Sequence, residues 1–287
     1  MVLVEKNTTV VTKLGFIDTH NHLCDSAFLD DVDEVVHRAM ASGVQAAIVL
    51  TETIPDISRA LELREKYPDW VNLGFGIHPI QKRNDGSNLP RSVVAKVSSY
   101  ARSKKETYSM ISPQDMDGFR ELLQKYSDLL VAVGEVGLDF TPSICATPDS
   151  HEIQRHVLST QIRLANRFNL PLNVHSRSAS KPTIELLRSE GATRVQMHAF
   201  DGRPSQALIG VSAGYYFSVP PCVLRSKQKQ ELVKAVPLTN LLLETDAPVL
   251  GVSAEVSCLY HPITFYSKYT YKTNTFYAFE KVTLIGF

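Results

Sequence analysis

Several features that would assign a chain to a specialised class of protein are missing from this sequence. No apolar run approaches the roughly eighteen residues that a membrane helix requires, and residues 1–12 lack the apolar core of a signal peptide. The four cysteines, Cys24, Cys145, Cys222 and Cys258, form no CxxC pair, so we expect neither a zinc knuckle nor a disulfide framework. These absences predict a soluble intracellular protein of the nucleus or cytoplasm, with no membrane partner.

Net charge and nucleotide-binding motifs are missing as well. Thirty basic and thirty acidic side chains cancel, so no global field draws the chain to nucleic acid, and any site for a polyanion must be local. Neither the GxGxxG fingerprint nor the P-loop occurs, which argues against the classical nucleotide-binding folds. With 287 residues, of which 44% are hydrophobic and 21% charged, the chain is expected to build one globular core.

Short apolar runs alternate with segments of helical spacing, which is the pattern of repeated βα units. The pattern predicts eight strands, over Phe16–Asp18, Gln45–Leu50, Val71–Ile77, Leu130–Gly134, Leu172–Val174, Val195–Met197, Tyr215–Val219 and Leu241–Leu243. It predicts seven helices between them, over Leu29–Ala41, Ile57–Tyr67, Pro113–Tyr126, Ser150–Phe168, Lys181–Ser189, Ser205–Ala213 and Ser226–Ala235. Eight apolar strands with intervening helices favour an α/β fold of the TIM (β/α)₈ barrel type, and an open doubly wound sheet is the alternative.

Two stretches interrupt this rhythm. Residues 81–112 form a basic insertion after the third strand, and residues 251–287 carry nine of the 24 aromatic residues without helical spacing, where an eighth helix is expected. We therefore predict an N-terminal extension over residues 1–14, a barrel over residues 15–250 and a divergent aromatic tail over residues 251–287 that lacks the closing helices.

Imidazoles and carboxylates follow several of the predicted strands. They are His20, His22, Glu135, His175, His198, Glu244 and Asp246. In an α/β barrel the carboxyl ends of all strands meet at one rim, so these side chains are expected to converge there. Buried together without cations they would repel one another or stay unsatisfied, whereas divalent metals would pair with them. Nitrogen and oxygen ligands without sulfur fit Zn²⁺, Mn²⁺ or Mg²⁺.

Six ordered motifs carry a resemblance to a known family. They are His20-Asn21-His22, Gly76-Ile77-His78-Pro79, Gly134-Glu135-Val136-Gly137-Leu138-Asp139, His175-Ser176-Arg177, His198-Ala199-Phe200-Asp201-Gly202 and Glu244-Thr245-Asp246. Together they resemble the TatD-type deoxyribonucleases, metal-dependent hydrolases on a TIM barrel within the amidohydrolase superfamily. Within that family the vertebrate TatD-domain-containing type 3 proteins are similar to this chain.

The resemblance implies a two-metal centre. His20, His22 and Asp246 would bind one ion, Glu135 would bridge, and His175 and His198 would complete the second site. Glu135 and Asp246 are thereby the expected catalytic residues, Asp246 as acceptor of a proton from the attacking water.

Other residues are expected to support this centre. Phosphate contacts are expected from His78, Arg177 and Arg203. Asp139 is expected to orient a ligand imidazole or a loop, and Glu244 resembles a carboxylate that supports the ligands or binds an additional metal.

The implied substrate is DNA, single-stranded or at its ends, cut by a monomer from the 3′ end and, as a further family activity, at abasic sites. Two alternatives stay open at this point. Fold and metal centre do not determine the substrate, so lactone, amide or phosphotriester hydrolysis is one of them. The other is an inactive variant that only binds metal or partners, because the family's closing helices are not recognisable after Leu250.

Overall fold

The computed structural model describes residues 15–81, 91–92 and 113–251 of the 287. The expected N-terminal extension, residues 82–90 and 93–112 of the basic insertion, and the aromatic tail beyond Gly251 lie outside these residues. None of the helices in the described part of the chain combines the length and apolarity that a membrane crossing needs.

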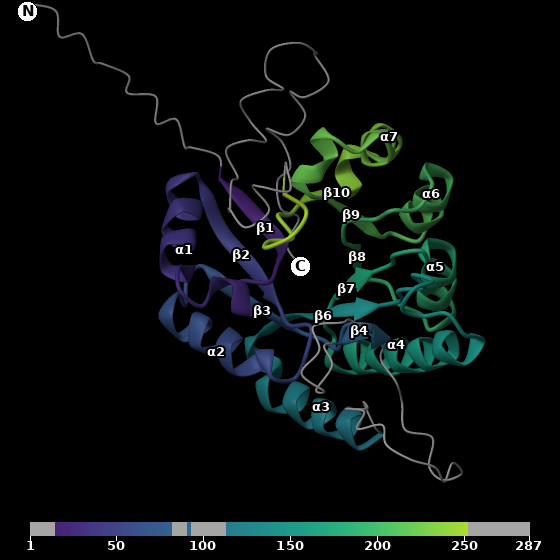
Figure 1. Ribbon diagram of the computed structural model, residues 1–287, viewed down its shortest axis with the longest axis horizontal. Helices are drawn as coiled ribbons and strands as arrows, with labels where there is room; N and C mark the ends of the chain where they lie inside the picture. Colours follow the sequence, from purple (N-terminus) through teal and green to yellow (C-terminus); the bar gives the residue numbers. More distant parts are fainter. Residues whose placement is uncertain (1–14, 82–90, 93–112, 252–287) are drawn as a thin grey trace, which may run out of the picture.

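One eight-stranded sheet forms the centre of the molecule and confirms the predicted barrel (Figure 1). Its strands follow one another in the order β1 (Phe16–Asn21), β2 (Val44–Leu50), β3 (Val71–Phe75), β6 (Leu130–Gly137), β7 (Leu172–His175), β8 (Val195–Met197), β9 (Tyr216–Val219) and β10 (Leu241–Leu243). Neighbours in this order pair in parallel. The short strands β4 (Ile80–Gln81) and β5 (Arg91–Ser92) pair antiparallel outside the barrel sheet.

Within the described ranges, seven α-helices surround the strands. Figure 1 shows them in sequence from α1 round to α7. They are α1 (Val32–Ala41), α2 (Asp56–Lys66), α3 (Pro113–Tyr126), α4 (Pro148–Phe168), α5 (Ser180–Ser189), α6 (Pro204–Ser212) and α7 (Lys227–Ala235), with short 3-10 helices at Ser26–Phe28, Ser127–Leu129, Pro221–Leu224 and Leu238–Asn240. All seven predicted helices are therefore confirmed, and no helix follows β10 within the described residues, which end at Gly251.

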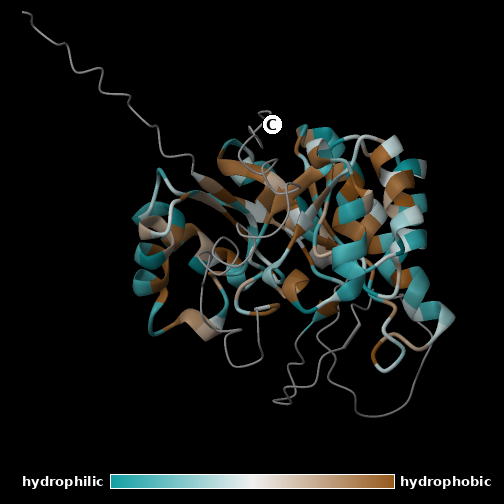
Figure 2. Ribbon diagram, turned by 90° about the horizontal axis from the view of Figure 1, so that it is seen from above, coloured by the Kyte–Doolittle hydropathy of each residue, from teal (hydrophilic) through white to brown (hydrophobic). Residues whose placement is uncertain are grey.

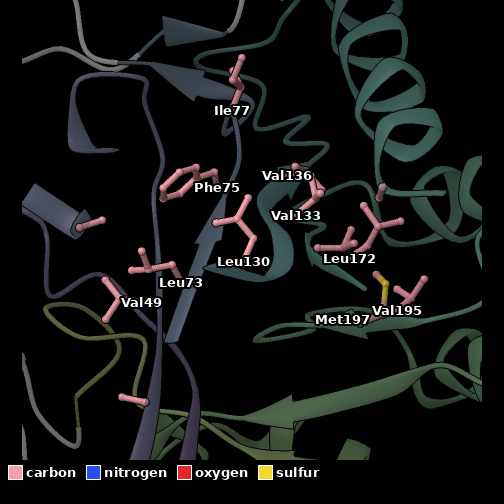
Figure 3. Close-up of a cluster of buried hydrophobic side chains, with 14 of the residues drawn as sticks. Val49, Leu73, Phe75, Ile77, Leu130, Val133, Val136, Leu172, Val195 and Met197 are labelled. Atoms are coloured by element: carbon pink, nitrogen blue, oxygen red, sulfur yellow. The ribbon is translucent and has the colours of Figure 1, made fainter. Parts of the chain in front are cut away.

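The core lies along the strands and between the strands and the helices. Figure 3 shows part of it, including Leu73, Phe75, Val133 and Val195, all of which are fully buried. Figure 2 shows apolar residues along the strands and polar residues spread over the surrounding helices. Strands buried in this way read as continuous apolar runs rather than as an alternating pattern, which is why the sequence displays them clearly.

Helix α4 positions two of the loops at the rim. It begins with a capping box, in which the Thr147 side chain accepts a hydrogen bond from the Ser150 amide at 3.2 Å. On its buried face, Gln161 accepts from the Ile77 amide at 2.8 Å and donates to the Ile77 carbonyl at 3.1 Å. Gln154 binds the amide and carbonyl of Asp139 in the same two-sided way, at 2.7 and 2.9 Å. The backbone segments after β3 and β6 are therefore held by one helix.

Strands β1 and β10 stand at the two ends of the strand order, and side chains help to join them. The Asp18 carboxylate accepts hydrogen bonds from the Thr245 amide at 2.9 Å and from the Thr245 hydroxyl at 2.7 Å. Just beyond, the Asp246 amide donates to the His20 carbonyl at 2.9 Å. We call this junction of Asp18, Thr245, Asp246 and His20 the seam.

Candidate metal centre

The six residues expected to bind metal converge at the carboxyl ends of the strands. We call His20, His22, Glu135, His175, His198 and Asp246 the rim cluster; every one of them is buried. His20, Glu135 and His175 lie on β1, β6 and β7. His22 and His198 directly follow β1 and β8, and Asp246 lies three residues after β10. Gly76 permits this convergence, because a Cβ atom at its position would lie 2.4 Å from the Glu135 carbonyl oxygen.

The first half of the rim cluster is built around His20 and His22. Their Nε2 atoms lie 3.1 Å apart. Asp246 Oδ1 lies 3.2 Å from the Nε2 atom of His20 and 3.5 Å from that of His22. Glu135 Oε2 lies 3.2 Å from His22 Nε2. Two nitrogens and two carboxylate oxygens therefore face a common point.

The second half is built around the other oxygen of Glu135. Oε1 lies 2.7 Å from His198 Nε2 and 3.0 Å from His175 Nδ1, and these two nitrogens are 3.2 Å apart. The rings of His20 and His198 stack with their centroids 3.8 Å apart, which brings the two halves into contact. The two oxygens of Glu135 thus face different halves of the rim cluster.

Hydrogen bonds to the far sides of the rings determine which nitrogens carry protons in the first half. His20 Nδ1 lies 2.8 Å from Asn173 Oδ1, and His22 Nδ1 lies 3.0 Å from the Leu50 carbonyl. Both oxygens can only accept, so each Nδ1 is the donor and each Nε2 presents a lone pair to the cluster in the neutral ring.

The second half is held differently. His175 Nε2 donates to the Asp139 carboxylate at 3.0 Å, so its Nδ1 carries the lone pair, and the expected orienting role of Asp139 agrees with this geometry. His198 Nδ1 has no hydrogen-bond partner among the described residues; the Oε2 atom of Glu244 lies 4.0 Å away. Glu244 itself accepts from the Ser218 hydroxyl at 2.5 Å and from the Ala199 amide at 2.8 Å.

The electrostatics of the rim cluster favour charged carboxylates. Burial alone would raise the pKa of Glu135, but the imidazoles of His198, His78 and His175 outweigh it and hold that pKa well below its ordinary value. In the same way, burial alone would raise the pKa of Asp246, but its interactions with the His20 and His22 rings outweigh burial and lower that pKa.

The pKa values of two neighbouring groups, His198 and Glu244, shift in the direction that favours the neutral form. Burial, reinforced by the nearby His20 ring, lowers the pKa of His198 to about 4 despite the attraction of Glu135. Burial also raises the pKa of the Glu244 carboxyl to about 7.

The residues present fit divalent metal ions. Nitrogen atoms of four imidazoles and oxygen atoms of two carboxylates face one another in a buried site, an arrangement that a cation satisfies and an apolar cavity does not. Three sets of ligand atoms come within 4.8 Å of one another, and they belong to His20 with His198 and Asp246, to His20 with His22 and Glu135, and to His78 with Glu135 and His175. Nitrogen and oxygen donors of this kind suit zinc, manganese or magnesium.

The three residues expected to contact phosphate have different surroundings. His78 is buried, and its Nε2 lies 3.4 Å from Glu135 Oε1. Burial would lower the pKa of His78, but the Glu135 carboxylate outweighs it and raises the pKa to about 9. The structure therefore brings His78 into contact with the rim cluster. Arg177 and Arg203 are exposed, and among the described residues neither makes an ion pair with the cluster.

Two residues around the centre were not anticipated from the sequence. Asn173, which holds His20, lies two positions before His175 on β7, and the two-residue period of a strand could have identified it. Lys229 is buried on α7 and contacts the loop after His198. A lysine on a polar helix gives no such signal, because its burial depends on tertiary packing.

Comparison with known proteins places this geometry in context. A model of the TatD related DNase family matches residues 17–278, and thus continues past Leu250, where the recognised motifs end. The human deoxyribonuclease TATDN3 is 43% identical over 243 residues, which are 85% of this chain and 81% of that protein. The metal-dependent hydrolase YabD of Bacillus subtilis is 30% identical over 81% of this chain and 80% of its own.

A solved structure agrees with these sequence relatives. The crystal structure of YJJV, a TatD homologue from Escherichia coli, superposes with a TM-score of 0.64 at 28% identity, over 81% of this chain and 79% of that one. The family match spans most of the chain, and the relatives are matched over most of their own length. The chain therefore belongs to the TatD related DNase family.

Proposed function

We propose that this chain is a metal-dependent deoxyribonuclease that hydrolyses phosphodiester bonds of DNA at the rim cluster. One observation carries the proposal: four imidazoles and two carboxylates converge on a buried site, and hydrogen bonds on the far sides of three of the rings turn an unprotonated nitrogen of each neutral ring toward it. The printed names of the relatives, a deoxyribonuclease and a metal-dependent hydrolase, support both the metal and the substrate.

The residues divide the work as follows. His20, His22 and Asp246 would hold one ion, His175 and His198 the other, and Glu135 would contact both through its two oxygens. Zinc, magnesium and manganese are the ions that suit these donors. Two such ions supply Lewis acidity toward a phosphodiester and lower the pKa of water.

The remaining roles belong to the chain's own side chains. Asp246 would accept a proton from the attacking water, a task for a carboxylate kept charged by its neighbours. His78 lies beside Glu135 and, with its raised pKa, can donate to a phosphate oxygen. Arg177 and Arg203 are exposed, and their guanidinium groups are free to contact phosphates along a bound strand.

The substrate we propose is single-stranded DNA or a DNA end, cut from the 3′ side by a monomer, with abasic sites as a second target, in the nucleus or cytoplasm. A chain with no net charge can hold such a substrate only by local cations. The basic residues of the insertion over residues 81–112 follow β3, whose carboxyl end belongs to the rim, and could extend this local site.

The test is an assay of the metal-loaded chain on a 3′-labelled and a 5′-labelled oligonucleotide, an abasic duplex, a phosphotriester and a lactone, with chelator-treated protein as the control. We expect metal-dependent shortening of the oligonucleotides. Turnover of the lactone or phosphotriester alone would favour the other amidohydrolase activities. Metal binding without turnover of any substrate would favour a chain that only binds.

A further inference from the structure

A lysine of helix α7 lies in the interior beside the rim. Lys229 is 4% exposed, and its Nζ donates to the Ala199 carbonyl at 2.6 Å and to Asp201 Oδ1 at 2.7 Å. A buried ammonium costs several kcal/mol unless it is paired and hydrogen-bonded, so its partners here are specific. Both partners belong to the loop that begins directly after His198.

The same loop is also held by Glu244, the first residue after β10. The amide of Ala199 donates to Glu244 Oε1 at 2.8 Å, while its carbonyl accepts from Lys229. Ala199 has a φ of +39°, in the left-handed region that a residue with a side chain rarely adopts. Contacts on both sides of this one residue maintain an unfavourable backbone conformation next to a ligand histidine.

His198 depends on its backbone more than the other three imidazoles of the rim cluster do. The rings of His20, His22 and His175 each donate from the nitrogen that faces away from the cluster. His198 Nδ1 has no such partner in the described part of the chain. Its ring stacks on that of His20 with an angle of 2° between the planes, a contact that aligns the ring plane but lets the ring slide within it.

We propose that Lys229 is a positioning residue for His198, which determines through the Ala199 carbonyl where the His198 Nε2 atom meets Glu135. The inference rests on the proposed metal centre. The rings of His20, His22 and His175 are each oriented by a hydrogen bond of their own. For His198, the contact of Lys229 with the Ala199 carbonyl takes this role by fixing the backbone next to the ring. Loss of this contact frees the loop and displaces one ligand, while the His20 and His22 half keeps its geometry.

The variant Lys229→Met tests this inference, because methionine keeps the apolar stem and removes the ammonium. Lys234→Met is the matched control: it changes a lysine of the same helix whose side chain is 70% exposed. We expect Lys229→Met to weaken one of two Zn²⁺-binding steps by about 10–100-fold, the usual cost of losing a partner behind a metal ligand, and to leave the other step unchanged. The visible spectrum of the Co²⁺-substituted protein should change, and kcat on an oligonucleotide should fall with KM unchanged.

Other outcomes separate the inference from the proposed function. If Lys229→Met melts lower but keeps both Zn²⁺ affinities and the Co²⁺ spectrum, Lys229 is structural only and the inference is wrong. If the unaltered chain itself binds no metal, the proposed function fails first.

A second variant covers the case in which Lys229→Met does not fold. Asp201→Ala removes a partner whose side chain is 45% exposed and leaves the contact of Lys229 with Ala199. We expect it to weaken the same Zn²⁺-binding step by a smaller factor, and an unchanged step would overturn the inference.

Discussion

The two halves of the rim cluster differ in how their imidazoles are held. In the first half, His20 and His22 donate to neutral oxygens in the barrel, the Asn173 amide and the Leu50 carbonyl. In the second half, His175 donates to the Asp139 carboxylate, and the Nδ1 atom of His198 has no hydrogen-bond partner among the described residues. Both rings of the first half are therefore oriented by neutral acceptors, whereas the second half depends on one charge and one loop.

His20 and His198 also differ in where they lie on the chain. His20 belongs to β1, whereas His198 is the first residue after β8. A strand fixes its side chains through its hydrogen-bonded ladder, whereas a loop fixes them only through the contacts of its own residues. We expect the two halves to differ in metal affinity and to respond to different substitutions.

The largest effect is expected where the halves meet. Glu135→Ala removes the one residue whose oxygens face both halves, so metal content should fall from about two ions to one or fewer. Hydrolysis should fall by about 10³-fold or more, since several kcal/mol of charge stabilisation are lost. Elemental analysis and an oligonucleotide assay check this, and retained activity with normal metal content would refute the shared role.

Metal removal should separate the halves. A chelator is expected to take the ion of the His175 and His198 half first, because that half is less firmly held. Each ion at about 100 times its dissociation constant adds about 2.7 kcal/mol of stability, so the melting temperature should fall by roughly 5–11 °C per ion. Simultaneous loss of both ions in a metal titration followed by calorimetry would contradict the comparison.

A pair of substitutions tests the partners behind the rings. Asp139→Asn keeps the shape but removes the charge beside His175, and Asn173→Ala removes the acceptor beside His20. Each should weaken a different metal-binding step by about 10–100-fold. Stepwise Zn²⁺ titration of both variants and of the double variant provides the measurement. If both variants weakened the same step, the division into halves would be wrong.

The smallest effect is expected at the junction of the first and last strands. The Thr19 hydroxyl donates to the Leu243 carbonyl at 2.9 Å, close to the seam. Thr19→Val removes this bond and the one that the same hydroxyl accepts from Gln196 Nε2 at 2.9 Å, at a cost of about 1–2 kcal/mol, or roughly 2–8 °C in melting temperature. Both metal affinities should stay unchanged because no ligand or ligand partner is altered, and a selective loss in either half would show that the junction positions ligands as well.

The sequence predicts the strands and the ligands for the same reason. Parallel strands buried on both faces are continuous apolar runs, and the barrel brings their carboxyl ends to one rim. Two of these apolar runs, however, are shorter than the strands that contain them. β1 was expected to end at Asp18 and extends to Asn21, and β6 was expected to end at Gly134 and extends to Gly137. The final residues of these strands are polar because they build the site, so they leave the apolar pattern while keeping the strand conformation.

The support behind the ligands was harder to predict. Asp139 was predictable because it follows a ligand in the same motif. The Leu50 carbonyl carries no side-chain signal, and Lys229 and the glutamines of α4 act on backbone atoms of distant loops. Such contacts depend on the packing of elements far apart in the chain, which a single sequence does not reveal. The exposed Arg177 and Arg203 keep their proposed roles only as predictions.

The seam has a consequence for how the protein matures on the ribosome. Asp18 and Thr245 are 227 positions apart, and they meet where His20 and Asp246 contribute to the same half of the rim cluster. Contacts so distant along the chain form late in folding, because closing the long loop between them costs conformational entropy before the contacts can stabilise the fold. A nascent chain that has emerged only as far as β9 already contains five of the six rim residues but cannot yet present the complete site. Metal uptake by the half that contains His20, His22 and Asp246 would then report that synthesis has passed the last strand and that the ring has closed.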